Sequence, residues 1–382
     1  NRNKRASIYM SSISNIFNGE LDLLTCSSNH DIANEISGLR NRIYVSRNGL
    51  RFNRYLRRFH IYAPDILPQD KKILQELSSI NYDYAICLRR FIRGNSLLLM
   101  QATNASYKYC AWQFPTESNW ANAEKYSHGW RHFCGDLSIA SEISYFKSFT
   151  EHIFGIPIDA RPRLRCMDEF TSEPEHGSVG LCLGGTVGNW PVENWSELVG
   201  LLQKQGCRVR LFGGEDIQPE ATEIANKHPG CVNFAGKNSF VDLLPELKKL
   251  SALIGNETGF THFASLIVPK VIVVYGGRTF RRFFPWPEAT NQYLIYHASD
   301  CFDCDNKCKY RLKRYICLKR INPIQVLKYF NDITSSIATE RERNLNPNLI
   351  RYQIAWRNWK KGKHYAIAPA GDKTHNKEDS RC

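Results

Sequence analysis

The sequence lacks any apolar run long enough to cross a membrane. Its apolar stretches, such as Val271–Tyr275, have the length of a buried strand, whereas a spanning helix needs about 18 apolar residues. It also lacks a secretory leader pattern at its start, and its glycine loops fit neither a P-loop nor a GxGxxG that opens a helix. These absences argue against a transmembrane protein, an exported protein, a P-loop ATPase and a dinucleotide dehydrogenase, and we expect a cytoplasmic protein.

Acidic residues are scarce relative to basic ones. The chain of 382 residues has 37 Asp and Glu against 51 Lys and Arg, a formal charge of +14. Such an excess indicates an anionic partner, namely a nucleic acid, a membrane surface or a phosphorylated substrate, or else a solvated basic surface. Basic residues are concentrated over 40–58 and 301–364. Neither of these regions interleaves aromatics and glycines as an RNA-recognition sheet does, so we expect no nucleic acid. The length suits two or three domains.

Short β-rich runs alternate with amphipathic segments, which is typical of an α/β protein with parallel sheets. A polar, proline-containing stretch near residues 155–178 is interpreted as a connector between domains. No strand precedes the first predicted helix and the chain starts with Asn1, so we expect the first strand to lie before residue 1. The predicted strands are 21–26, 41–45, 84–88, 179–183, 208–212, 231–234, 252–255 and 271–275, and the predicted helices are 7–17, 191–204, 216–225, 240–250, 258–267 and 323–337.

Glycine pairs follow three of the predicted strands, at Gly184–Gly185, Gly213–Gly214 and Gly276–Gly277. Glycine lets a backbone approach a phosphate closely, although tight strand-to-helix turns use glycine in any case. Three such turns at one sheet edge favour a ligand site there, because ligands of doubly wound folds bind at the carboxyl ends of strands.

The sharpest local signal is the run Asn256-Glu257-Thr258-Gly259-Phe260-Thr261-His262. Thr258 is placed to cap the helix that follows, with free N–H groups facing a diphosphate. Glu257 lies just outside the sheet edge, and His262 is one turn into the helix, from where it can point back at a ligand. A capped helix with a packed histidine explains the run equally well.

Several motifs in the second half, in this order and spacing, resemble the nucleotide-sugar domain of glycosyltransferase family 9, the bacterial heptosyltransferases of lipopolysaccharide core assembly. The resemblance covers about 150 residues. The matching pieces are Leu183-Gly-Gly-Thr, Asn189-Trp-Pro-Val-Glu-Asn-Trp, Leu211-Phe-Gly-Gly, Phe234-Ala-Gly-Lys-Asn-Ser, Leu253-Ile-Gly-Asn-Glu-Thr-Gly-Phe-Thr-His-Phe-Ala and residues 269–275.

The resemblance implies a GT-B fold, in which two doubly wound Rossmann-like domains face a cleft, together with a small Cys-rich metal finger. The expected organisation is an acceptor-binding domain over 1–160, a nucleotide-sugar-binding domain over 161–298, a finger over 299–320, C-terminal helices returning to the first domain over 321–368, and a disordered tail over 369–382.

The resemblance also implies the reaction, an inverting transfer of a sugar, most simply heptose from ADP-heptose, to a glycan such as the lipopolysaccharide core. A base deprotonates the acceptor hydroxyl, which displaces the nucleoside diphosphate without a catalytic divalent metal. The family's catalytic Asp is expected before residue 1, so no catalytic residue is assigned. The base of the nucleotide is expected near 235–238 and the diphosphate near the start of the helix at Thr258. The donor-binding candidates are Gly185, Thr186, Asn189, Gly214, Lys237, Asn238, Glu257, Thr258, Gly259 and His262.

The chain departs from the family at two positions that bear on the donor. Gly188 and Asn189 stand where users of ADP-heptose often carry Lys before the Trp-Pro pair, and Glu257 stands where Asp is usual. Both departures leave the donor open between ADP-heptose and another nucleotide sugar.

Arginines gather where an anionic substrate would bind. The run from Arg40 to Arg58 holds seven arginines and no acid, and a phosphorylated lipopolysaccharide core is a fitting acceptor because arginine binds phosphate bidentately. A protein acceptor, as for autotransporter heptosyltransferases, or an O-antigen remains an alternative, as does a solvated basic face. Arg278 is a further candidate to neutralise the leaving diphosphate. The acceptor or phosphate candidates are Arg89, Arg90, Arg93, Arg281 and Arg282.

Cys301, Cys304, Cys308 and Cys317 form the pattern C-x₂-C-x₃-C-x₈-C. Four thiolates in so short a polar segment suit a structural tetrahedral iron or zinc site, and an iron-binding finger is known in relatives that modify autotransporters. Disulfides or free thiols are the alternatives, and a reducing cytoplasm disfavours disulfides.

Two other interpretations stay open. One is a nucleotide-sugar epimerase or hydrolase, and the other is a non-catalytic metal-finger protein that binds an anionic polymer. The basic aromatic stretch around Trp356 and Trp359 suits either packing on the first domain or peripheral contact with anionic lipid at the inner membrane.

Overall fold

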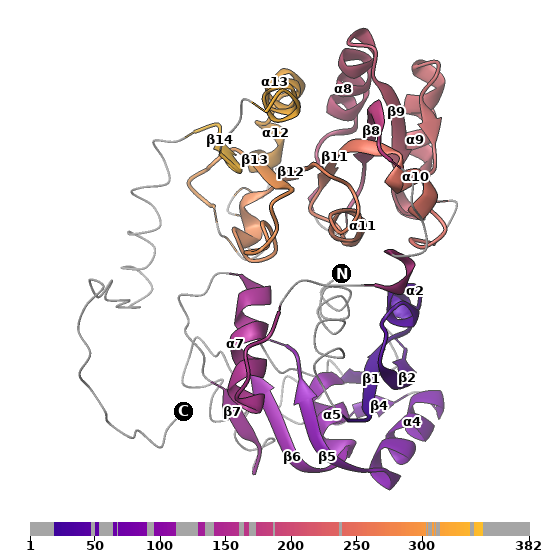
Figure 1. Cartoon of the computed structure of the whole chain (residues 1–382), viewed down its shortest axis with the longest axis vertical. Helices are drawn as coiled ribbons and strands as arrows, with labels where there is room; N and C mark the ends of the chain where they lie inside the picture. The colour runs from indigo at the N-terminus through magenta and orange to yellow at the C-terminus, as the bar shows by residue number, and fades with distance from the viewer. Residues whose placement is uncertain are drawn as a thin grey trace, which may run out of the picture. The chain divides into compact units, whose positions relative to one another are not determined.

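A computed structural model of the chain divides into two compact units, residues 1–169 and 170–381 with Cys382 grouped to the first (Figure 1). The predicted helix at 7–17 and the segment 347–382 lie outside the described residues. Among the described residues, no helix is both long and apolar enough to cross a membrane. The structure describes residues 19–46, 50–52, 64–66, 68–89, 95–111, 129–133, 141–159, 164–167, 173–185, 188–236, 239–302, 304, 308, 310, 314–336 and 340–346.

The first unit contains small sheets in its described part. β1 pairs with β2 in parallel, β3 with β4 antiparallel, and β5, β6 and β7 form a parallel three-stranded sheet. The strands predicted at 21–26, 41–45 and 84–88 correspond to β1, β2 and β5. The elements are β1 (Leu21–Cys26), η1 (Ser27–Asn29), α2 (His30–Asn34), β2 (Leu39–Val45), β3 (Leu50–Phe52), β4 (Pro64–Ile66), α4 (Pro68–Ser79), β5 (Asn81–Cys87), α5 (Asn95–Ala102), β6 (Asn104–Ala111), β7 (Arg131–Phe133), α7 (Glu142–Phe154) and η2 (Arg165–Met167).

The second unit is built on a seven-stranded parallel sheet in the order β10-β9-β8-β11-β12-β13-β14. The strands and helices before the pocket described below are β8 (Glu175–Cys182), α8 (Val192–Lys204), β9 (Arg208–Phe212), η3 (Glu215–Ile217), α9 (Gln218–Lys227), β10 (Val232–Asn233), α10 (Leu244–Lys248), β11 (Leu250–Asn256) and α11 (Gly259–Ala264). Those that follow are β12 (Val271–Tyr275), η4 (Gly277–Thr279), β13 (Gln292–Tyr296), α12 (Ile316–Lys319), α13 (Pro323–Thr334) and β14 (Glu342–Asn344).

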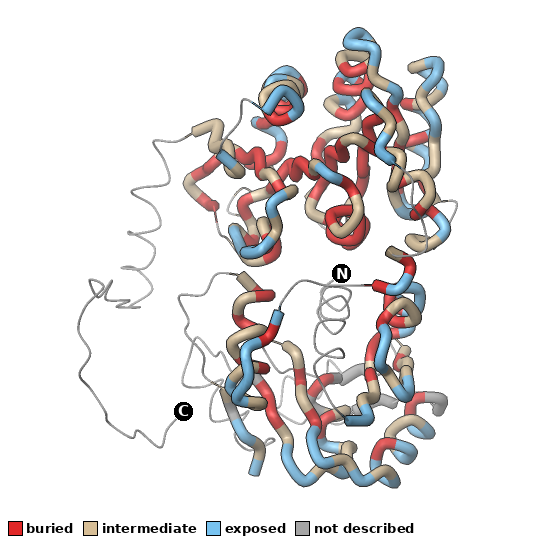
Figure 2. Tube along the Cα trace, viewed as in Figure 1, coloured by how far each residue is buried: buried red, intermediate tan, exposed pale blue. Residues whose placement is uncertain are grey.

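This sheet is covered on both faces, and its central strands are almost wholly buried (Figure 2). α8, α9 and α13 pack on one face, where Leu198, Ile224 and Phe330 join one apolar cluster with Leu181 and Ile254 of the strands. Parallel strands buried on both faces are continuous apolar runs, and for that reason the sequence located β12 at its observed ends.

Three predicted boundaries in this unit are wrong. The helix predicted over 240–250 covers only Leu244–Lys248, with Pro245 in its first turn, where a missing N–H costs nothing. Leu250 instead begins β11. The polar residues near 175, interpreted as part of a connector, begin β8, because Glu175 pairs with Arg208 and Arg210 of the neighbouring strand at 3.2 and 3.3 Å.

Two strands and the place of one helix differ from the sequence interpretation. β13 and β14 extend the sheet beyond β12 but were not predicted, and the polar three-residue β14 carries no strand pattern. α13 packs in the apolar cluster with α8, so this part of the segment expected to return to the first domain belongs to the second unit. Its start is fixed by a capping box of Asn322 and Gln325.

Candidate functional site

The strands of the second unit run parallel, so the turns that follow them meet at one edge of the sheet. β8, β11 and β12 are neighbours there. Their turns carry Gly184–Gly185, the run from Asn256 to Gly259, and Gly276–Gly277. The site is therefore assembled from three turns that the strand order brings side by side.

Asn256 ties the first two of these turns together. Its buried side chain accepts a hydrogen bond from the backbone N–H of Trp190 at 3.3 Å and donates one to the carbonyl of Gly184 at 3.0 Å. Both backbone groups are buried, and a buried polar group without a partner costs about 1–3 kcal/mol. Asn256 thus fixes the path of the first glycine turn, a role that the sequence interpretation did not give it.

Thr258 caps α11 as predicted. Its hydroxyl accepts a hydrogen bond from the N–H of Thr261 at 3.2 Å, and the Thr261 hydroxyl donates to the Asn256 carbonyl at 2.7 Å. α11 is shorter than predicted and covers only Gly259–Ala264. These bonds leave Glu257 at the turn itself, between the end of β11 and the capped helix.

Glu257 forms a partly buried ion pair with Arg278 from the turn after β12. The two side chains lie 3.1 Å apart, and those of Glu257 and Arg278 are 6% and 20% exposed. His262 Nε2 lies 3.9 Å from the other carboxylate oxygen of Glu257. The His262 ring is fully buried and stacks on Phe284 with the ring centroids 3.9 Å apart. His262 therefore supports Glu257 from behind and does not line the pocket in front of it.

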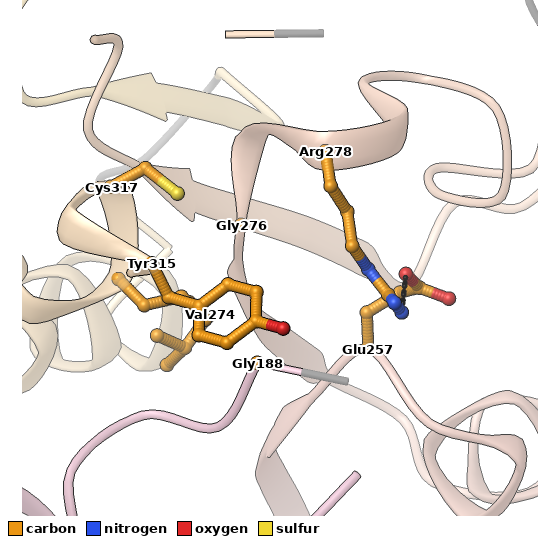
Figure 3. A pocket seen from close by; sticks show the side chains of 8 residues that line it. Gly188, Glu257, Val274, Gly276, Arg278, Tyr315 and Cys317 are labelled. Atoms are coloured by element: carbon orange, nitrogen blue, oxygen red, sulfur yellow. Dashed lines mark hydrogen bonds and ion pairs between the residues drawn. The ribbon is translucent and has the colours of Figure 1, made fainter. Parts of the chain in front are cut away.

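A pocket opens in front of this ion pair (Figure 3). Glu257 and Arg278 supply its charged groups, Tyr315 supplies an aromatic ring and a hydroxyl, and the remaining surface is apolar or glycine. The residues that line it are Gly188, Glu257, Val274, Gly276, Arg278, Tyr315, Cys317 and Leu318. Arg278 was a candidate for the leaving diphosphate, whereas Tyr315 was not predicted, because no local pattern connects residues near 315 with the turns at 188 and 257.

The other predicted donor residues take various places. Gly185 lies close to Asn189 and Thr258, because a Cβ added to Gly185 would lie 2.9 Å from Asn189 Oδ1 and 3.4 Å from a Thr258 methyl. Gly214 belongs to the turn after β9, where Asp216 folds over it. Thr186, Lys237 and Asn238 lie outside the described residues.

Of the predicted phosphate-binding arginines in the second unit, neither Arg281 nor Arg282 lines the pocket. Arg281 forms an ion pair with Glu342 of β14 at 2.8 Å, and the guanidinium of Arg282 lies 5.1 Å from the ring centroid of Phe283. Arg89 of the first unit donates to the Ser96 hydroxyl at 2.8 Å. Arg90 and Arg93 lie outside the described residues. Arg278 is the arginine of its turn that lines the pocket.

The four clustered cysteines lie beside the pocket. Burial, together with the nearby thiols of Cys304, Cys317 and Cys308, raises the pKa of Cys301 to about 11. Burial also raises the pKa of Cys317, against the opposing effect of the backbone N–H groups of Gly277 and Leu318 that bond its sulfur. Within the described ranges, no group of three or more His, Cys, Asp or Glu side chains is arranged to hold a metal ion, and this includes the four thiols.

A parallel sheet flanked by helices, with a pocket at the carboxyl ends of its strands, defines the second unit as a doubly wound α/β domain of the kind that binds nucleotides. Residues 156–311 match the sequence profile of glycosyltransferase family 9 (heptosyltransferase). Over this segment the chain is similar to glycosyltransferase family 9, the family that its motifs predicted.

Curated relatives match over a limited length. The chain is 30% identical over 110 residues to lipooligosaccharide heptosyltransferase 2 of Haemophilus influenzae, covering 27% of this chain and 32% of that protein. It is 28% identical over 88 residues to lipopolysaccharide heptosyltransferase 1 of Escherichia coli K12, covering 23% of this chain and 28% of the relative. In both cases the match spans less than two thirds of the relative.

Solved structures match over most of the chain. The E. coli heptosyltransferase WaaC with ADP-2-deoxy-2-fluoro heptose superimposes with a TM-score of 0.59 at 17% identity, over 86% of this chain and 95% of that one. A family 9 glycosyl transferase from Veillonella parvula gives a TM-score of 0.64 at 13% identity, over 87% and 95%. At these identities the likeness establishes the fold, which is that of the heptosyltransferases.

Proposed function

We propose that the chain is an inverting glycosyltransferase that transfers a sugar from a nucleotide-diphospho-sugar to a cell-surface glycan. The observation that carries the proposal is the partly buried Glu257–Arg278 pair in a pocket at the β11 and β12 edge, within the segment that matches family 9. ADP-heptose is the donor we favour, because the matched structures include a heptosyltransferase with an ADP-heptose analogue. The lipopolysaccharide core is the favoured acceptor and a protein the alternative.

The described residues suit donor binding. Glu257 is an acceptor for sugar hydroxyls, and Arg278 holds its carboxylate in place at 3.1 Å. At the first turn, Gly185 lets a ligand approach the backbone closely. Its φ of +152° is a conformation that glycine adopts readily. Transfer needs a base that takes the proton of the acceptor hydroxyl as that oxygen attacks the anomeric carbon. No described residue is assigned this role, and the acceptor arginines of the first unit remain predictions.

We propose in addition that Cys301, Cys304, Cys308 and Cys317 bind a structural iron or zinc ion. The four cysteines fall within one short segment, and the thiols of Cys304, Cys308 and Cys317 lie close enough to affect the ionisation of Cys301. A bound ion would order the short polar segment before α12.

Metal content tests this second proposal. Purified protein should contain about one iron or zinc per chain by mass spectrometry, and Co²⁺ should give thiolate charge-transfer absorbance. Cys304→Ser should remove both signals, whereas Cys207→Ser, outside the segment, should leave them intact. Sub-stoichiometric metal together with no Co²⁺ spectrum would overturn it.

A thermal-shift titration with ADP, UDP, GDP and their sugars tests the donor proposal. A ligand that binds the folded chain stabilises it by RT ln(1 + [L]/Kd), so ADP and ADP-heptose should raise the melting temperature. Glu257→Gln should abolish the additional shift from the sugar, whereas Glu342→Gln, which disrupts the Arg281 pair outside the pocket, should not. Stabilisation by a UDP or GDP sugar instead would identify that sugar nucleotide as the donor in place of ADP-heptose. No shift with any nucleotide would favour the anionic-polymer interpretation.

A further inference from the structure

The pocket in front of Glu257 has a mixed chemistry. It combines a carboxylate, a guanidinium, a phenol ring and a small apolar floor formed by Val274 and Leu318. A carboxylate repels a phosphate but accepts hydrogen bonds from hydroxyls, and an apolar or aromatic surface suits the C–H face of a sugar ring. The pocket is therefore better suited to a neutral polyhydroxylated ring than to a diphosphate.

Tyr315 is held in this pocket by an unusual backbone. Its φ of 61° and ψ of 35° are left-handed, a conformation that is unfavourable for a non-glycine residue. Non-glycine residues in this region cluster at ligand clamps, where surrounding contacts hold them. Here the short helix α12 begins directly after Tyr315, and Leu318 of that helix lies against Gly276.

The ring of Tyr315 rests on Gly188. A Cβ added at Gly188 would lie 2.8 Å from one ring carbon of Tyr315 and 3.1 Å from another. Because Gly188 has no side chain, it makes room for this ring. Gly188, which departs from the family motif, and Tyr315, which lies outside that motif, are therefore neighbours in the pocket.

The hydroxyl of Tyr315 is directed into the pocket, on the side where Glu257 and Arg278 lie (Figure 3). Among the residues that the structure describes, no hydrogen bond is formed by this hydroxyl. A phenol both donates and accepts, so together with Glu257 it can satisfy two sugar hydroxyls.

We propose that Tyr315, with Glu257 and Arg278, binds the transferred sugar and determines which sugar is accepted. This inference rests on the proposed function, in which the nucleotide base lies near Ala235 and the diphosphate near Thr258. The turns after β10, β9, β8, β11 and β12 follow one another along the sheet edge. A donor laid along that edge from Ala235 past Thr258 reaches the pocket with its sugar.

Calorimetric titration of the full chain with ADP and with ADP-heptose tests this role. Tyr315→Phe should weaken ADP-heptose about tenfold, as loss of one hydrogen bond predicts, and leave ADP unchanged. Tyr315→Ala should weaken ADP-heptose further. Tyr310→Phe is the matched control, because it also removes a tyrosine hydroxyl from this segment. That hydroxyl donates a hydrogen bond to Asp300 and does not line the pocket.

The outcomes separate the two proposals. Failure of the wild-type chain to bind either probe would overturn the donor assignment and the sugar pocket with it. Binding of ADP without tighter or altered binding of ADP-heptose would overturn the sugar pocket alone. Equal losses for both probes in Tyr315→Phe, at an unchanged melting temperature, would assign Tyr315 to the nucleotide instead of the sugar.

Discussion

Two sides of the pocket are built by different means. The β11 side (Asn256–Gly259) is a continuous run held by hydrogen bonds from Asn256, Thr258 and Thr261. The cysteine side (Tyr315–Leu318) is held by packing, since Leu318 lies against Gly276 and Phe302 against Gly277. Hydrogen bonds within a short motif are visible in a sequence, whereas packing between distant segments is not. The comparison explains why only one side was predicted.

The largest effect is expected from Asn256→Ala on the β11 side. The substitution leaves the buried N–H of Trp190 and carbonyl of Gly184 without their partner, which should lower the free energy of unfolding by about 3 kcal/mol. Denaturant titration measures this loss. The exposed Asn189→Ala is the control and should change stability by less than about 0.5 kcal/mol. Similar values for both variants would show that the β11 side does not depend on this bond pair.

The cysteine side should respond instead to added volume. A Cβ at Gly277 would lie 1.9 Å from the Phe302 ring, so Gly277→Ala should destabilise the chain by about 1–3 kcal/mol through overpacking. Phe302→Ala in the same chain should recover part of that loss. A double-mutant cycle measures the coupling, and additive losses would contradict packing of this ring on the turn.

A smaller effect is expected at the cap of α11. Thr258→Ala should cost about 1 kcal/mol because it removes the acceptor for the Thr261 N–H. Thr258→Ser keeps that oxygen and should retain most of the stability. If thermal unfolding shows the two variants to be equally destabilised, the methyl group and not the cap is what matters at this position.

The smallest effect is expected away from both sides. Arg281 is half-exposed and paired with Glu342, so Arg281→Ala should change stability by no more than about 1 kcal/mol. It should leave the affinity for ADP-heptose unchanged, in contrast to Arg278→Ala. A marked loss of donor affinity in Arg281→Ala would extend the site beyond the two sides described here.

The sequence was informative where local chemistry determines structure. The apolar run Val271–Tyr275 predicted a buried strand, and the Thr258 cap followed from its place at the start of the predicted helix. The polar strand Glu342–Asn344 has no such pattern, because its pairing with β13 is backbone bonding at the sheet border. Tyr315 likewise reaches the pocket through a left-handed turn that no propensity indicates for tyrosine. Resemblance located the donor motifs, but not Tyr315, whose ring lies against Gly188.

A crystal structure of the chain with ADP-heptose tests the central claim most directly. The account predicts the diphosphate beside Thr258 and the heptose in front of Glu257, with its hydroxyls within hydrogen-bond distance of Glu257 and of the Tyr315 phenol. A heptose that lies away from this pocket, or a phosphate seated against Glu257, would contradict it.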